Sequence, residues 1–426
     1  MTWAFESGRD DTGFDRRPAD RDAVIVATAR TPIGRAVKGS LASVRPDDLA
    51  AGVIEAALAK LPGFDPATLD DLYLGCAEPR DEHGGNLARR VAVQLGLDTV
   101  PAATVNRFCA SSVQTARMAT HAIWAGEGDA YVSAGVECVS RYRGFGSAGV
   151  DPSDTQNPLF AAAGARTVRT AETNERWHDP RLDGELPDIY IAMGQTAENV
   201  ATAYGVSRAD QDAFGVRSQN LAEQAIAAGV FASEIAPVTL ADGTVVTTDD
   251  GPRPGTTLAA VSTLRPVFRA DGTVTAGNCC PLNDGAAAVV IMSGARAAEL
   301  GLTPLARIVT STATGLSPEI MGVGPVEATR RALGQAGLSL ADLGLVEINE
   351  AFAAQVIASE RALGLDEDRL NVHGGAIALG HPFGSTGARI MTTLLNAMQR
   401  HDVELGLETM CVGGGQGMAI ILQRLS

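Results

Sequence analysis

The sequence is short of lysine, of positive charge and of long apolar runs, and each shortage excludes a class of protein. The 426 residues carry 34 basic and 50 acidic side chains, for a formal net charge of −16. This balance provides no basic surface for nucleic acid or for an anionic membrane. Lys38 and Lys60 are the only lysines and neither follows glycine, so a P-loop is excluded. The longest purely aliphatic stretch, 286–292, is far shorter than the roughly 18 residues that cross a bilayer.

The six cysteines and six histidines show no spacing that is typical of a metal site. There is no C-x-x-C pair and no H-E-x-x-H, which argues against structural and catalytic zinc. We therefore expect reduced thiols, no metal and a cytoplasmic protein. Residues 1–20 mix acidic and basic side chains without an apolar run, unlike a signal or transit peptide. We interpret them as a flexible N-terminal extension.

Aliphatic runs alternate with helical spacing along most of the chain, which predicts an α/β protein. Residues 22–28 predict a buried first strand, 46–61 a helix, and 71–75 a second strand. Between about 142 and 277 the alternation lapses into a proline-rich stretch, which we interpret as an inserted loop domain. The aliphatic pattern resumes at 284–292.

A weak internal repeat links the two halves of the chain. Segments 104–135 and 371–413 share the order strand, small-residue loop, alanine-rich helix, strand. The first loop carries a cysteine and the second a histidine. A duplicated domain would bring these two loops face to face.

Cys109 lies at the predicted start of a helix that runs to Gly126. Helix N-termini lower the pKa of a thiol and offer free backbone N–H groups. Such a cysteine can be a thiolate at neutral pH, and the same N–H groups can receive an oxyanion when it attacks a carbonyl. The alternative is a buried structural cysteine.

Three other segments carry polar groups beside glycine or at the end of an apolar run. In Gly-His381-Pro, local backbone restricts the ring, so the imidazole can deprotonate a thiol; the alternative is a helix cap. Cys411 precedes three glycines, which allow a ligand close to the backbone. Asn349 and Glu350 follow a predicted strand, where Asn349 could instead cap the next helix.

Together these four motifs resemble the thiolase family, acyltransferases that make or cleave 3-ketoacyl-CoA. The resemblance runs from about residue 23 to residue 425, in the family's order. It implies a duplicated, five-layered α/β/α/β/α fold with an inserted loop domain. The implied N-terminal domain covers 21–293 and the C-terminal domain 304–426.

The resemblance also implies a role for each motif residue. Cys109 would be the acylated nucleophile, His381 would activate it, and Cys411 would be the acid/base at the acetyl-CoA carbon. Asn349 would hold a water that forms one oxyanion hole with His381, and the backbone amides of Cys109 and Gly413 would form the other. Coenzyme A is a co-substrate, so no cofactor is implied. Contacts with CoA and the acyl group are implied for Arg253, Cys280, Met193, Phe268, Met321 and Phe352.

Three positions depart from the family pattern. Ser112 replaces a glycine, Cys280 replaces a serine that contacts the pantetheine arm, and Ala192 replaces a histidine found in many acetoacetyl-CoA-forming members. The last departure favours a degradative thiolase that accepts longer 3-ketoacyl chains.

Three alternatives stay open at this point. A biosynthetic acetyl-CoA acetyltransferase would share the same motifs. A non-catalytic lipid-carrier homologue would have lost the nucleophile or the base, whereas Cys109, His381 and Cys411 are all present. Ketosynthases complete their site with two histidines, or with a histidine and an asparagine, where this chain has Cys411. The resemblance further implies a homodimer or a dimer of dimers, and allows a hydratase/dehydrogenase partner subunit.

Overall fold

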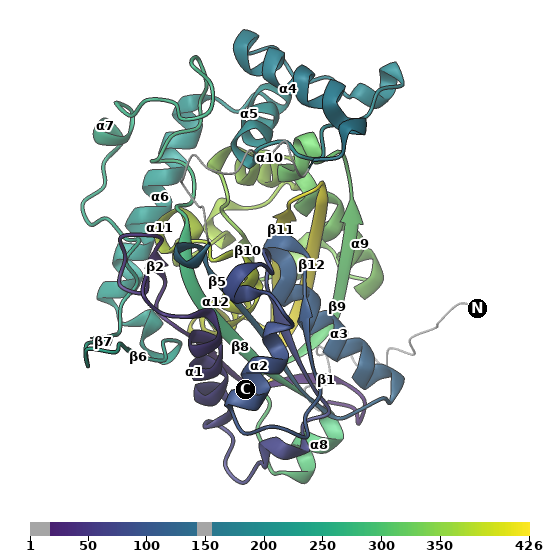
Figure 1. The fold of residues 1–426 in the computed structure, drawn as a ribbon. Coiled ribbons are helices and arrows are strands. Elements are labelled where there is room, and N and C mark those ends of the chain that lie inside the picture. The colour runs from purple at the N-terminus through teal and green to yellow at the C-terminus, as the bar shows by residue number, and fades with distance from the viewer. Residues whose placement is uncertain (1–17, 143–155) are drawn as a thin grey trace.

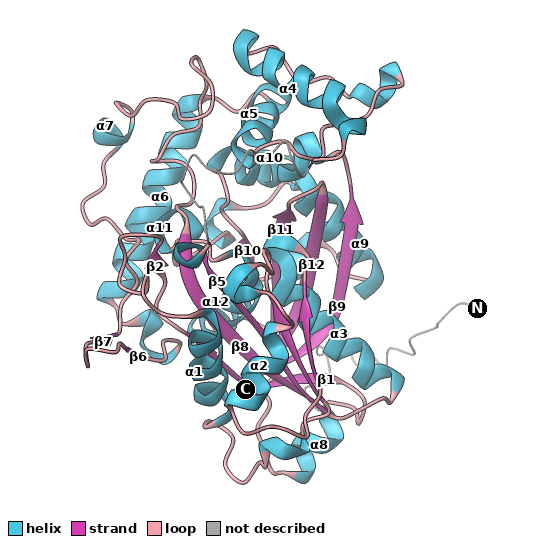
Figure 2. Ribbon diagram, in the orientation of Figure 1, coloured by secondary structure: helices cyan, strands magenta, loops and turns pink. Residues whose placement is uncertain are grey.

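The computed structural model describes residues 18–142 and 156–426, which form a mixed ten-stranded sheet and a separate two-stranded hairpin (Figures 1 and 2). Most of the predicted N-terminal extension lies outside the described residues. No helix in the described part of the chain is both long and apolar enough to span a membrane.

The strands are β1 Ala23–Arg30, β2 Gly34–Arg35, β3 Asp71–Gly75, β4 Ala102–Val105, β5 Ala130–Cys138, β6 Val238–Thr239, β7 Val245–Val246, β8 Asn283–Ser293, β9 Ala306–Gly315, β10 Leu345–Ile348, β11 Leu405–Val412 and β12 Gln416–Arg424. The helices are α1 Pro46–Leu58, α2 Leu87–Gln94, α3 Ser111–Ala125, α4 Ala161–Thr173, α5 Met193–Tyr204, α6 Arg208–Ala227, α7 Leu258–Val261, α8 Gly294–Glu299, α9 Gly324–Ala336, α10 Ala353–Leu363, α11 Ala376–Leu379 and α12 Thr386–Arg400.

The large sheet consists of two halves with the same strand pattern. The first half has the order β4-β3-β5-β8-β1 and the second the order β10-β11-β12-β9. In the first half β3 pairs in parallel with β5, and in the second half β10 pairs in parallel with β11. In both halves the next two pairings are antiparallel. A short antiparallel pairing of β1 with β9 joins the halves. The duplication predicted from the weak repeat is therefore confirmed.

The prediction of a strand at the start of the second repeat is wrong. Where β4 stands in the first half, the second half has a single parallel bridge between Val346 and Leu370. Asn371 follows with a positive φ of 47°. Its side chain bonds both the N–H and the C=O of Ile348, at 2.8 and 2.9 Å. An asparagine side chain thus takes the hydrogen bonds that a strand backbone would make.

Five layers follow from the alternation of side chains along the strands. In β1, Val24 and Val26 pack against α1 and α2, while Ala23 and Ile25 pack against α3 and α12. In the second half, the strands lie between α3 and α12 on one face and α9 and α10 on the other. Both faces of each half are buried, which explains the nearly continuous aliphatic runs. The predicted α/β/α/β/α order is confirmed.

The region between β5 and β8 contains α4 to α7 and the β6-β7 hairpin, and α4, α5 and α7 lie at the top of the view in Figure 1. Helix α6 begins at a capping box formed by Ser207 and Asp210. Helices α5 and α6 pack on α10, and α6 also packs on α11. Part of the predicted loop domain, 143–155, lies outside the described residues, and its boundaries stay a prediction.

Candidate active site

Cys109 lies in a tight turn between β4 and α3, just before the helix begins. The preceding Phe108 has a positive φ of 44°, which is unusual for an aromatic residue and stores strain at this turn. Side chains hold the turn in place: Asn106 Oδ1 accepts from the Phe108 N–H at 2.8 Å, and Ser111 Oγ accepts from the Arg107 N–H at 2.9 Å. The strained turn therefore sets the position of the thiol.

The Cys109 thiol is protonated at neutral pH. Burial raises its pKa to about 11, although the backbone N–H groups of Gly413 and of Cys109 itself bond the sulfur and oppose the rise. The prediction of a thiolate at neutral pH is therefore wrong, because desolvation outweighs the helix terminus. The two N–H groups are those that the resemblance assigns to one oxyanion hole. A base is needed to release the thiolate.

His381 is held on three sides by backbone and side-chain bonds. Gly380, with a φ of 113°, leads into it, and Asn283 Oδ1 accepts from its N–H at 2.9 Å. Its Nδ1 lies 2.7 Å from Thr386 Oγ1, and that hydroxyl donates to the Pro382 carbonyl at 3.0 Å. A hydroxyl that donates to a carbonyl can only accept from the ring, so Nδ1 carries the proton. Nε2 is left as the basic nitrogen.

Burial, reinforced by the positive charge of Arg389, lowers the pKa of His381 to about 3. The ring is therefore neutral at physiological pH and can accept a proton. It does not cap the next helix, since α12 has Ser385 at its N-cap position. That structural alternative is excluded.

Asn349 contacts the same histidine. Its Nδ2 lies 3.3 Å from His381 Nε2, and its buried Oδ1 has no hydrogen-bond partner among the described residues. Helix α10 has Phe352 at its N-cap, so Asn349 is not a helix cap. Gln355 Nε2 donates to the Asn349 carbonyl at 2.6 Å and restrains it. A buried amide oxygen without a partner beside a neutral histidine suits the binding of a water or a substrate group.

Cys411 is the last residue but one of the buried strand β11, and burial and the neighbouring Cys109 raise the pKa of its thiol above the usual range. Desolvation also raises the pKa of the Cys280 thiol, which interacts electrostatically with Cys279, Cys109 and Cys411. Segments that are far apart in the sequence therefore place several thiols in one site. Because Cys411 is protonated at neutral pH, it is able to donate a proton.

Four residues implied to contact the acyl group meet beside Cys411. Met321, Phe352 and Cys411 are buried in one apolar cluster, and Met193 and Phe268 pack against it. The rings of Phe268 and Phe352 meet edge to face, with centroids 6.3 Å apart. The Cys411 side chain therefore has an apolar surface on one side.

Arg253 differs from these residues because it is exposed, at the rim of the site. Its guanidinium donates to the Ala276 carbonyl at 3.3 Å, and its backbone N–H donates to Gln219 Oε1 at 2.8 Å. Burial raises the pKa of Cys279 to about 11, and the charge of Arg253 opposes that rise, so the two side chains are neighbours. A guanidinium at this rim can meet a phosphate.

Two buried acidic side chains anchor the histidine loop; the sequence analysis missed Glu137 and noted Glu350 without giving it a role. Glu137 Oε2 accepts from the Gly384 N–H at 2.8 Å, and Glu350 Oε2 accepts from the Ile377 N–H at 3.1 Å and from Ser218 Oγ at 2.6 Å. The sequence signal that could have identified them is an acidic residue inside an apolar run. Such a residue is buried, and a buried carboxylate needs several hydrogen-bond donors from other segments.

We expect Thr386→Val to lower the rate of acylation of Cys109 by about 10- to 100-fold, because an unpaired buried ring N–H costs about 1–3 kcal/mol. The measurement is the rate of acetyl transfer from acetyl-CoA, followed by mass spectrometry. Thr392→Val in the same helix is the control, since its hydroxyl donates only to the Ala388 carbonyl at 2.8 Å. Equal rates for the two variants would show that the Thr386 hydroxyl does not orient the ring.

Two family models match the chain, the thiolase N-terminal domain over residues 23–295 and the thiolase C-terminal domain over 302–424. The chain belongs to the thiolase family. A 3-ketoacyl-CoA thiolase of Bacillus subtilis is 44% identical over 416 residues, covering 95% of this chain and 99% of the relative. An acetyl-CoA acetyltransferase of Pseudomonas aeruginosa is also 44% identical, over 412 residues, covering 95% and 100%. The protein is accordingly an acyltransferase.

Solved structures agree with this assignment. The acetyl-CoA acetyltransferase of Bacillus anthracis superposes with a TM-score of 0.83 at 37% identity, covering 95% of this chain and 98% of that one. The dimeric peroxisomal thiolase of Saccharomyces cerevisiae has a TM-score of 0.83 at 32% identity, with coverage of 95% and 98%. The relatives carry both degradative and biosynthetic names, so the names leave the direction of the reaction open.

Proposed function

We propose that this thiolase cleaves 3-ketoacyl-CoA by thiolysis, giving acetyl-CoA and an acyl-CoA shortened by two carbons, as in fatty acid β-oxidation. The observation that carries the chemistry is the packing of the Cys109 turn against residues 383–385, just after His381, and against strand β11, which contains Cys411. This packing groups a neutral His381, the Cys109 thiol with two N–H groups on its sulfur, and the Cys411 thiol. The observation that favours the degradative type is Ala192, which lines a cavity where a histidine would reduce the space.

The first half-reaction begins when Cys109 gives its proton to Nε2 of His381 and attacks the C3 keto carbon. The N–H groups of Cys109 and Gly413 stabilise the oxyanion that forms at C3. The C2–C3 bond then breaks, and its electron pair moves to C2 as the enolate of acetyl-CoA. The Nε2–H of His381 and a water held by Asn349 stabilise the enolate oxygen, and Cys411 donates its proton to C2.

The second half-reaction restores the site. The thiol of CoA gives its proton to the Cys411 thiolate and attacks the acyl group on Cys109. Cys109 leaves as a thiolate and takes its proton back from His381. Coenzyme A is the only group required besides the acyl substrate, so we propose no cofactor and no metal, with Arg253 contacting the nucleotide end of CoA.

The second candidate is biosynthetic formation of acetoacetyl-CoA from two acetyl-CoA molecules. The thioesters on Cys109 and on CoA are nearly equal in energy, so the same site can run in both directions, and relatives named acetyl-CoA acetyltransferase support this candidate. Steady-state rates of thiolysis over a ladder of 3-ketoacyl-CoA lengths test the proposal. We expect kcat/KM for a medium-chain substrate to equal or exceed that for acetoacetyl-CoA; confinement to acetoacetyl-CoA would favour the biosynthetic type.

We expect Ala192→His to shift the preference toward acetoacetyl-CoA by about tenfold, because a histidine ring would fill space equal to about two methylenes worth about 0.8 kcal/mol each. The measurement is the ratio of kcat/KM for a medium-chain substrate to that for acetoacetyl-CoA. Ala295→His, at an exposed position of α8, is the control. An unchanged ratio in the Ala192 variant would remove the structural basis for the degradative assignment.

We propose that the protein acts in the cytoplasm as a homodimer or a dimer of dimers. One solved relative, the peroxisomal thiolase of Saccharomyces cerevisiae, is dimeric. Strand β4 ends the large sheet, and in the described part of the chain no strand pairs with its outer edge. The proposal also allows a hydratase/dehydrogenase subunit as a partner.

The lipid-carrier alternative predicts no acetyl adduct on Cys109 after incubation with acetyl-CoA, which mass spectrometry tests directly.

A further inference from the structure

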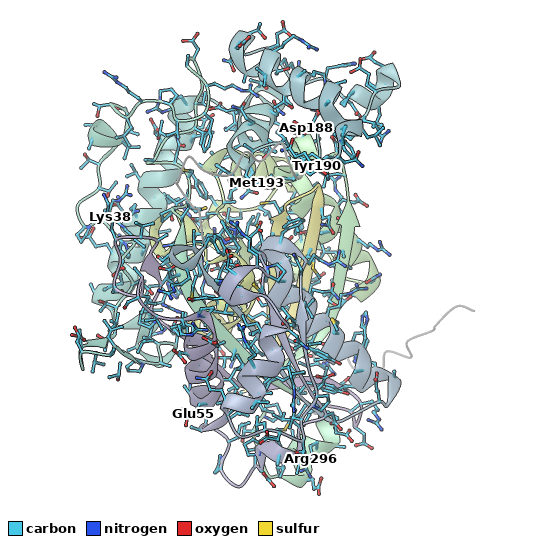
Figure 3. All side chains as sticks on the ribbon, viewed as in Figure 1. Lys38, Glu55, Asp188, Tyr190, Met193 and Arg296 are labelled. Atoms are coloured by element: carbon cyan, nitrogen blue, oxygen red, sulfur yellow. The ribbon has the colours of Figure 1, made fainter. Side chains whose placement is uncertain are left out.

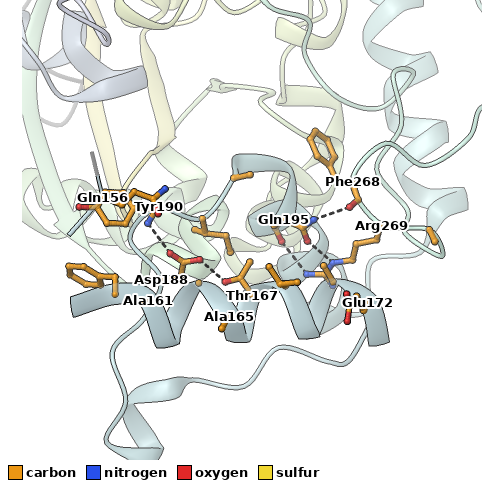
Figure 4. Close-up of a pocket in the computed structure, with 17 residues that line it drawn as sticks. Gln156, Ala161, Ala165, Thr167, Glu172, Asp188, Tyr190, Gln195, Phe268 and Arg269 are labelled. Atoms are coloured by element: carbon orange, nitrogen blue, oxygen red, sulfur yellow. Dashed lines mark hydrogen bonds between the residues drawn. The ribbon is translucent and has the colours of Figure 1, made fainter. Parts of the chain in front are cut away.

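A cavity of about 630 Å³ opens beside the apolar cluster that contains Cys411, between α4 on one side and residues 188–195 and 268–270 on the other. Figure 4 shows α4 along one wall, with Tyr190, Gln195 and Arg269 coming from the segments opposite. In Figure 3, Tyr190 lies near Met193, at the top of the view. This volume is within the range of about 300–1,000 Å³ that is usual for small-molecule sites.

The cavity adjoins the apolar cluster of Cys411, because Ala192 and Phe268 line the cavity and Met193, the residue after Ala192, packs against that cluster. Phe268 also packs on the cluster of Cys411, and its ring lies against the first turn of α5, where a Cβ on Gly194 would come within 2.3 Å of the ring carbons. An acyl chain that extends from this cluster toward Ala192 would therefore enter this cavity.

Helix α4 presents small side chains to the cavity at helical spacing. Ala161, Gly164, Ala165, Val168 and Ala171 all line it. A Cβ added at Gly164 would meet no atom within 4 Å, so this wall borders open space. Small residues along one face leave room for an extended apolar chain and offer it no hydrogen bonds.

The charged groups of the cavity disfavour a second carboxylate on the acyl chain. Two acidic side chains, Asp188 and Glu172, line the cavity, against the single guanidinium of Arg269. The guanidinium is buried, and its donors already meet neutral oxygens, with Nε 2.9 Å from Gln195 Oε1 and Nη2 2.6 Å from Asn199 Oδ1. An added anionic end would therefore meet two like charges and a cation that already has partners.

We propose that this cavity is the subsite for the acyl chain, that it takes unbranched apolar chains without an ω-carboxylate, and that α4 at Gly164 sets the accepted chain length. This inference rests on the proposed thiolysis and names the substrate class of the same site. The chain would lie between α4 and the 188–195 segment.

The test compares Gly164→Leu with wild type by thiolysis of acetoacetyl-CoA, 3-oxohexanoyl-CoA and 3-oxodecanoyl-CoA. We expect the ratio of kcat/KM for the ten-carbon substrate to that for acetoacetyl-CoA to fall at least tenfold, equivalent to the loss of about two buried methylenes. Ala165→Leu on the same helix should act in the same direction. Gly334→Leu in α9 is the matched control, because a Cβ there also meets no atom within 4 Å and the position does not line the cavity.

Each failure has a separate meaning. Wild-type thiolysis of all three substrates with a ratio unchanged by Gly164→Leu and Ala165→Leu would overturn the subsite and leave the proposed function standing. Absence of thiolysis of any substrate by wild type would overturn both. For the charge argument, we expect 3-oxoadipyl-CoA to be cleaved at least tenfold less efficiently than 3-oxohexanoyl-CoA, which has the same number of acyl carbons; the reverse order would overturn the exclusion of ω-carboxylates.

Discussion

Replacement of Cys109 by serine is expected to abolish acyl transfer, with a fall in kcat of about 10³-fold or more. A serine hydroxyl is far harder to deprotonate than a thiol, and a neutral His381 cannot supply that difference. An ester on serine would also lie well below a thioester in energy, so the exchange with CoA would stop. The measurements are thiolysis of acetoacetyl-CoA and the mass of the acetylated protein.

The turn that carries position 109 is held by Asn106 and Ser111, so the variant should keep the fold and the melting temperature of wild type. Cys138→Ala is the control, since that thiol is buried at the end of β5 in the outer hydrophobic core. It should retain transfer. More than a trace of thiolysis by the Cys109 variant would mean that another group is the nucleophile.

Replacement of Cys411 by alanine is expected to separate the two chemical steps. Acetylation of Cys109 by acetyl-CoA leaves Cys411 as a thiol, and His381 can pass the Cys109 proton to the departing CoA thiolate. We therefore expect acetylation to stay within about tenfold of wild type. Making or breaking the C2–C3 bond needs a proton at C2, and we expect thiolysis to fall by about 10³-fold or more. The measurements are acetyl exchange between acetyl-CoA and labelled CoA, and thiolysis of acetoacetyl-CoA.

Equal losses in the exchange and thiolysis assays would contradict this division of roles between the two cysteines. Cys280→Ser serves as the comparison, because it changes a neighbouring thiol without removing the proposed acid. The comparison is informative because desolvation raises the pKa of both thiols above the usual range. Only the one that reaches C2 should affect the carbon–carbon step.

Local sequence patterns were sufficient for most of the elements that position the site. The strand predicted over 71–75 is β3, and the helix predicted from the cysteine turn to Gly126 is α3, which ends where Gly126 adopts a φ of 77°. Both depend on neighbours in the chain, because aliphatic runs, helical spacing and a C-terminal glycine are local signals. The same signals failed near Asn371, where a side chain makes the hydrogen bonds of a strand.

The role of Asn349 could be decided only from the folded chain. Its sequence position suited a helix cap as well as a site residue, and its contact with His381 joins two loops that the sequence keeps apart. The anchoring by Glu137 and Glu350 is likewise a contact between segments. Motif spacing contains no information about which backbone N–H a buried carboxylate meets.

The sequence by itself determined the family resemblance and the α/β class, and it supplied Cys109, His381 and Cys411 as candidate reactive residues, because each motif is a short stretch whose residue types suit one chemistry. The tertiary structure decided their protonation and the space around them. Burial raises the pKa of Cys109 and lowers that of His381, so the resting site holds a thiol and a neutral base in place of a thiolate. The cavity proposed for the acyl chain lies between α4 and residues 188–195 and 268–270. Desolvation and cavity shape depend on segments brought together by folding, so no single motif could have predicted them.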